Sequence, residues 1–111
     1  MNQIPGRDWK KLRAFKEDAL NLACERIFKK IDRISKEREG NEHEAYLDLW
    51  QTLNEEEKKI ADMFDEIKRY NAVQKLSLWK YYNILTNEQF AQFSEETQQT
   101  INTMLEIYNG R

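Results

Sequence analysis

Hydrophobic residues recur every three or four positions along the first third of the chain, which predicts one long amphipathic helix. The pattern follows Pro5 and Gly6, starts at a natural N-cap, Asp8, and runs to about Glu39, before Gly40. Such a helix is about 45 Å long, whereas a compact chain of this size has a radius of gyration near 13 Å. Its main apolar face comprises Trp9, Leu12, Ala19, Leu20, Ala23, Ile27, Ile31 and Ile34.

Three large residues of this helix lie outside the main face. Phe15 and Leu22 form a second, narrower strip, and Phe28 lies off both. One partner helix cannot easily cover all of this surface. Two interpretations remain: a subunit interface covers the rest, or other helices of the same chain do.

A second helical pattern follows a short polar turn. Its stripe is interrupted by six polar residues between Leu53 and Ile60. Either Asn54 and Glu57 form a capping box that starts a new helix, or one helix continues with this stretch in solvent. We favour the continuous helix, because no glycine or proline marks a stop. The apolar positions are Tyr46, Leu49, Trp50, Leu53, Ile60, Ala61, Phe64 and Ile67.

The last third of the chain predicts a group of shorter helices. Residues 68–84 are apolar or aromatic on most sides, which predicts a central, buried helix. Thr86-x-x-Gln89 is a capping box that opens a short helix, and Ser94 caps the last helix, with acidic residues in its first turn. The predicted fold is therefore all-α and dimeric. It has one domain over 1–111, with long stalk helices over about 8–67 and a helical head over about 68–111.

Composition and charge exclude several classes of function. The 111 residues are 40% hydrophobic and 34% charged, and the net charge of −2 disfavours nucleic acid as the main partner. No stretch approaches the ~20 apolar residues of a membrane span, and the N-terminal residues lack the apolar core of a signal peptide. We therefore expect a cytoplasmic protein that is not inserted in a membrane.

Catalytic and metal-binding residues are scarce. One cysteine, Cys24, excludes an internal disulfide, and with the single histidine, His43, it cannot complete a four-ligand zinc site. Glu55, Glu56 and Glu57 resemble a diiron carboxylate cluster only superficially, because a second histidine is missing. The three glycines form no phosphate-binding loop. We expect a non-enzymatic protein without a cofactor, in which Cys24 is a buried small residue and His43 is solvated.

Two short motifs carry a family resemblance. Ala19, Ala23 and Arg26 form an Ala-x-x-x-Ala-x-x-Arg stretch in the first helix, and Asp48-Leu49-Trp50 follows in the second. This order and spacing resembles the fluorescence recovery proteins of cyanobacteria and their wider relatives. The segment 85–94 is similar to the part of that family's C-terminal head where a short helix precedes the last one, so the resemblance covers nearly the whole chain.

The resemblance implies a regulatory binding function. Members of the family are small all-α homodimers that bind the C-terminal domain of the photoactivated orange carotenoid protein. They speed its return to the resting orange form and so end quenching at the phycobilisome. The resemblance thus places this protein in photoprotection, at the thylakoid-side antenna through its partner. Population shift explains such a function without covalent chemistry.

The resemblance also implies which residues bind the partner or form the dimer. Where the family usually carries His-Asp after its tryptophan, this chain has Leu53 and Asn54, and Lys58 and Lys59 stand where an arginine is usual. Asparagine lacks the carboxylate charge and lysine lacks the bidentate fork of arginine, so the partner surface is expected to differ. The implied residues are Asp48, Trp50, Leu53, Asn54, Lys58, Lys59, Phe90 and Phe93.

Other functions fit the same helices. Core packing and an interface both suit Trp50, the residue type most enriched at interface hot spots. A generic dimeric scaffold or adaptor would use the same surface for another protein partner. Leu85-Thr86-x-x-Gln89 looks like the boxes of periplasmic helical chaperones, but those proteins require a secretion signal.

Overall fold

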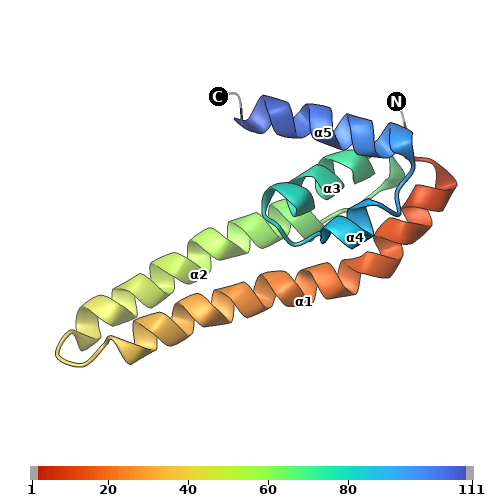
Figure 1. The fold of residues 1–111 in the computed structure, drawn as a ribbon. Helices are drawn as coiled ribbons and strands as arrows, with labels where there is room; N and C mark the ends of the chain where they lie inside the picture. The colour runs from red at the N-terminus through yellow and green to blue at the C-terminus, as the bar shows by residue number, and fades with distance from the viewer. Residues whose placement is uncertain (1–2, 110–111) are drawn as a thin grey trace.

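The computed structural model describes residues 3–109, and every regular element in that range is a helix. Two long helices form an antiparallel hairpin, and the remaining elements pack at its open end (Figure 1). The predicted all-α class is confirmed. None of the described helices is both long and apolar enough to cross a bilayer. The elements are α1 (Gly6–Lys36), α2 (Glu42–Phe64), η1 (Arg69–Asn71), α3 (Ala72–Tyr81), α4 (Asn87–Phe90) and α5 (Glu95–Asn109).

The start of α1 differs from the prediction. Pro5 occupies the N-cap and its carbonyl accepts the first helical hydrogen bond, from Trp9 N. Asp8 is therefore not the cap, as we had predicted, but lies in the first turn and is completely buried. The helix also ends earlier than predicted, at Lys36, and Gly40 takes a left-handed φ of +84° in the turn to α2.

The second long helix is continuous, as we favoured. α2 runs unbroken through Asn54 and Glu57, so the alternative with a second helix start there is wrong. It ends at Phe64, three residues before the predicted end, because Asp65 is extended, with ψ 141°, and Glu66 then adopts a left-handed φ of 49°. The predicted helix over 68–84 is accordingly shorter: a 3₁₀ turn precedes α3, which ends before Asn83, another left-handed residue with φ 60°.

α3 lies at the centre of the core, as its pattern predicted. Leu76 and Trp79 are completely buried. The indole Nε1 of Trp79 donates to Met63 O at 2.9 Å, and its ring stacks on Phe64 with 5.3 Å between centroids. These contacts join the end of α2 to α3. The buried core comprises Ile4, Leu12, Ala19, Ala23, Met63, Phe64, Ala72, Leu76, Trp79, Ile84, Leu85, Phe93 and Ile101.

The two predicted start signals in the C-terminal region are confirmed. Thr86 Oγ1 accepts from Gln89 N, and the Gln89 side chain accepts from Thr86 N, each at 3.0 Å. This reciprocal pair opens α4. Ser94 Oγ likewise accepts from Thr97 N at 3.3 Å, and α5 begins at the next residue.

A buried carboxylate joins the start of α1 to the start of α5. Asp8 Oδ1 accepts from Ser94 N at 2.9 Å, and Asp8 Oδ2 accepts from Ser94 Oγ and Thr97 Oγ1, each at 2.6 Å. Three donors compensate for the water that the carboxylate loses on burial. The residue that we predicted as a helix cap therefore fixes the last helix on the first.

Candidate docking face

Every buried residue of the hairpin lies near its open end. In α1 the last one is Ala23, and in α2 the first one is Met63. No residue between these two is buried, although this stretch carries many large apolar side chains. The closed end of the hairpin (Figure 1, lower left) therefore has no core of its own.

One side of the hairpin is apolar. A groove of about 260 Å³ near the closed end runs between the two helices. Phe28 lies one turn before Ile31, so it extends this side of α1; Trp50 and Leu53 lie one turn beyond Tyr46 and Leu49 and extend it on α2. The groove is lined by Ile31, Ile34, Ser35, Arg38, Glu42, Ala45, Tyr46 and Leu49.

Four large side chains on this side are exposed, and two more, Ile31 and Leu49, are partly exposed. We refer to Phe28, Ile31, Tyr46, Leu49, Trp50 and Leu53 together as the hairpin face. Monomeric proteins rarely expose a continuous apolar area of this kind, which makes the hairpin face a candidate docking surface. The exposed fractions are 64% for Phe28, 54% for Tyr46, 53% for Trp50 and 42% for Leu53.

The opposite side of the hairpin is charged. Near the closed end it carries Arg33, Glu37, Glu44 and Asp48, which line a second depression between the helices. Solvent satisfies such groups, so this side requires no partner for its own stability. The hairpin thus presents two chemically different surfaces on one pair of helices.

The structure separates the residues that the family resemblance implied. Trp50 and Leu53 share the hairpin face, whereas Asp48 lies on the charged side. Asn54 and Lys58 are exposed outside the groove. The sequence pattern indicated Phe28 as part of a subunit interface in one of its two interpretations, but it did not single out Tyr46. Periodicity shows which residues share a helix face but not whether that face is covered.

The two phenylalanines from the C-terminal helices have different environments. Phe93 is only 2% exposed and packs edge-on against Phe15, with 5.9 Å between ring centroids. It belongs to the core and is not available to a partner in this conformation. Phe90 is half-buried under Lys80, whose Nζ lies 4.0 Å from the ring centroid. Neither residue adjoins the hairpin face.

The Ala-x-x-x-Ala-x-x-Arg stretch contacts the C-terminal helices from α1. Ala19 and Ala23 are buried, and their small side chains let neighbouring helices approach closely. Arg26, one turn further on, donates through Nη1 to Tyr82 O and through Nη2 to Asn83 O at 2.5 Å. It thereby satisfies carbonyls that the end of α3 leaves free.

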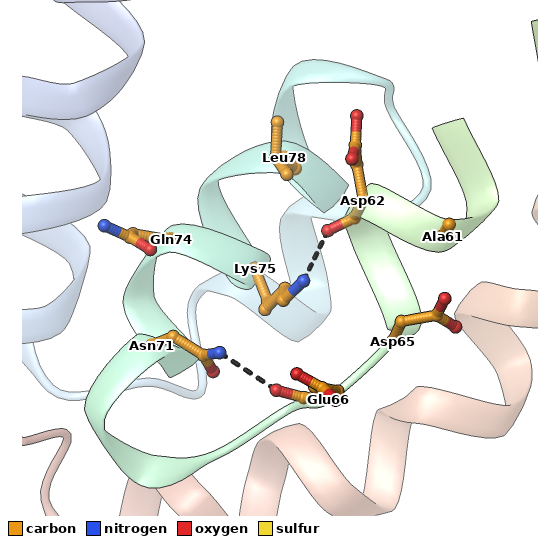
Figure 2. A pocket seen from close by; sticks show the side chains of 8 residues that line it. All are labelled: Ala61, Asp62, Asp65, Glu66, Asn71, Gln74, Lys75 and Leu78. Atoms are coloured by element: carbon orange, nitrogen blue, oxygen red, sulfur yellow. Dashed lines mark hydrogen bonds between the residues drawn. The ribbon is translucent and has the colours of Figure 1, made fainter. Parts of the chain in front are cut away.

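An open hollow of about 770 Å³ lies where α2 turns into α3 (Figure 2). Lys75 Nζ donates to Asp62 O at 2.6 Å, and Asn71 Nδ2 donates to Glu66 O at 2.9 Å. The carboxylates of Asp62 and Asp65 point away from each other in Figure 2 and share no hydrogen-bond donor. These hydrogen bonds stabilise the turn between α2 and α3.

The other candidates from the sequence are Cys24 and His43. Cys24 is half-buried rather than buried as predicted, because it lies beyond the last core residue of α1. His43 is exposed, as expected. Within residues 3–109 no three His, Cys, Asp or Glu side chains come together as metal ligands.

Comparison of the chain with protein-family models, with curated proteins and with solved structures finds no match.

Proposed function

We propose that this protein is a non-enzymatic regulatory protein that forms a homodimer through the hairpin face and binds a second protein. The hairpin is the dimerising stalk and the C-terminal helices are the head. The single observation that carries the proposal is the apolar hairpin face, whose large side chains the chain itself leaves uncovered.

The size of the exposed surface supports a dimer. The chain exposes 7834 Å², whereas a compact monomer of 13.5 kDa exposes about 6,500 Å². Its radius of gyration is 16.6 Å, against about 13 Å for a compact chain of this length. The excess exceeds the roughly 800 Å² that each partner buries in a standard interface. A second copy suits the hairpin face, because a two-fold axis places the same patch on both subunits.

The resemblance to fluorescence recovery proteins supplies the specific partner. We propose that the dimer binds the C-terminal domain of the photoactivated orange carotenoid protein, accelerates its reversion and so ends quenching at the phycobilisome. The regulator acts by binding conformations on the way back to the resting state more tightly than it binds the active state. Such a mechanism needs binding surfaces and no reacting groups.

The dark reversion of light-activated orange carotenoid protein tests this proposal. We expect the purified protein, added at equal concentration, to shorten the reversion time several-fold. Trp50→Ala should lose most of this effect, whereas Tyr70→Ala, which removes an exposed aromatic ring outside the hairpin, should keep it. An unchanged reversion time with the wild-type protein would reject this partner and leave the scaffold function in its place.

A further inference from the structure

A small cleft opens where the charged side of the hairpin meets the end of α3. Its volume is about 180 Å³, roughly six water molecules, which suits one side chain of a partner. Its floor is apolar, formed by Ala23, Ile60, Met63 and Ile84. The remaining lining residues are Arg26, Lys30, Glu56, Lys59 and Tyr82.

The cleft carries more positive than negative charge. Lys30 Nζ and Lys59 Nζ both contact the same oxygen of Glu56, at 2.5 and 3.4 Å. The guanidinium of Arg26 donates to two backbone carbonyls and makes no ion pair with a described carboxylate. The lining of the cleft therefore holds three cations and one anion, in a chain whose net charge is −2.

The pKa of Glu56 reflects the positive charge around it. Burial alone would raise the pKa of Glu56, but the hydrogen bond and charge of Lys30, together with Lys59, outweigh burial and lower it. The site thus favours the ionised form of a carboxylate. Lys30 and Lys59 remain about half exposed, so both ammonium groups have donors left for a second acceptor.

An aromatic surface adjoins this cationic cleft. Lys59 Nζ lies 5.7 Å from the centroid of the Tyr82 ring, which meets Tyr81 edge-on at 5.1 Å. Tyr81 in turn meets Tyr108 at 5.6 Å and is itself exposed, as is the neighbouring Ile107. A ligand that places a carboxylate in the cleft therefore finds an apolar surface beside it.

We propose that this cleft binds an acidic side chain from the protein partner, flanked in the partner's sequence by apolar residues. The carboxylate meets Arg26, Lys30 and Lys59, and a flanking apolar residue packs on Tyr81. The inference rests on the proposed function, since it assumes a protein partner, and it adds where that partner docks. The cleft lies on the side opposite the hairpin face, so both surfaces can be occupied at once.

The chain offers matched controls for the two lysines. Lys29 and Lys58 are the immediate neighbours of Lys30 and Lys59, are exposed, and do not line the cleft. The double variants Lys30→Gln/Lys59→Gln and Lys29→Gln/Lys58→Gln therefore remove the same charge from the same two helices. Exposed ion pairs contribute little to stability, so both variants should fold, which a thermal melt checks.

Amide NMR spectra during peptide titration test the inference without the carotenoid protein. We expect acetyl-Leu-Glu-Leu-amide to shift signals of the cleft residues, and acetyl-Leu-Gln-Leu-amide to leave them unchanged. At a fixed peptide concentration the shifts should fall at least about fivefold in Lys30→Gln/Lys59→Gln and persist in Lys29→Gln/Lys58→Gln.

Three results would overturn the inference. The first is that both peptides shift the cleft signals equally, and the second is that both double variants reduce these shifts equally. The third is that inorganic phosphate displaces the peptide and shifts the same signals. The last result would indicate a site for free anions. If the cleft binds the peptide but the protein does not change the reversion of the carotenoid protein, only the proposed partner is rejected. If the protein accelerates reversion but its cleft does not bind the peptide, only this inference is rejected.

Discussion

The two ends of the hairpin differ in what covers their apolar side chains. At the open end, Leu12, Ala19 and Ala23 are buried against the C-terminal helices. At the closed end, Phe28 and Trp50, on equally regular helices, are more exposed than buried. The open end therefore supports itself through contacts within the chain. The closed end leaves its large apolar side chains exposed. If a second copy covers them, as we propose, substitutions at the open end should change stability and those at the closed end should change association.

Trp79→Ala should have the largest effect on stability. Removing a completely buried indole leaves a cavity at the centre of the core and costs about 4 kcal/mol. Denaturant unfolding followed by circular dichroism measures this loss. Trp79→Phe keeps the stacking on Phe64 but removes the donor to Met63 O, so its loss should be smaller. A stable Trp79→Ala protein would show that the open end is not the core.

Asp8→Ala should destabilise the protein by about 2–3 kcal/mol, because it leaves the buried donors of Ser94 and Thr97 without an acceptor. Asp18→Ala on the same helix is the control, since Asp18 is exposed and should change stability little. The same unfolding assay compares the two. Equal losses would show that the buried network contributes nothing beyond the loss of one charge.

Trp50→Ala should leave the stability of the single chain nearly unchanged and weaken dimerisation by about 2 kcal/mol, or roughly thirtyfold in dissociation constant. The reason is that Trp50 lies outside the core but has the largest side chain of the hairpin face. Sedimentation over a concentration series measures the association. If Tyr70→Ala, the exposed control, weakens the dimer equally, the hairpin face is not the interface.

Glu56→Gln should have the smallest effect, below about 0.5 kcal/mol at neutral pH, since its lysine partners are half exposed. The folded-state pKa of Glu56 lies below its ordinary value. Its pairs therefore stabilise the fold above the ordinary pKa, and this stabilisation is lost as the pH falls through the lower, folded value. The stability difference from wild type should therefore shrink as the pH falls through the folded-state pKa of Glu56. Glu57→Gln removes one charge without breaking an ion pair, so at neutral pH it is the control for the loss of charge alone.

Local signals predicted local structure well. The Thr86–Gln89 capping box forms because both partners lie within one helical turn. The helix class of each segment followed from its periodicity for the same reason. Asn54 and Glu57 carry a similar signal, yet the helix continues through them, since nothing in the chain around them breaks it.

Burial depended on contacts that the sequence does not display. The partners of Asp8 lie 86 and 89 positions away, so its pattern suggested only a helix cap. Phe93 and Trp50 are both aromatic residues at helical spacing, but only Phe93 has neighbours from another helix above it. Periodicity finds an apolar face, whereas the path of the rest of the chain decides whether that face is covered.

The molar mass in solution, measured by light scattering over a micromolar concentration range, tests the central claim most directly. A chain of 13.5 kDa that shields its hairpin face with a second copy should scatter as a particle of twice that mass. Dilution should yield the single chain, and Trp50→Ala should move that transition to higher concentration. A mass of 13.5 kDa at every concentration would contradict the claim that a second copy covers the hairpin face.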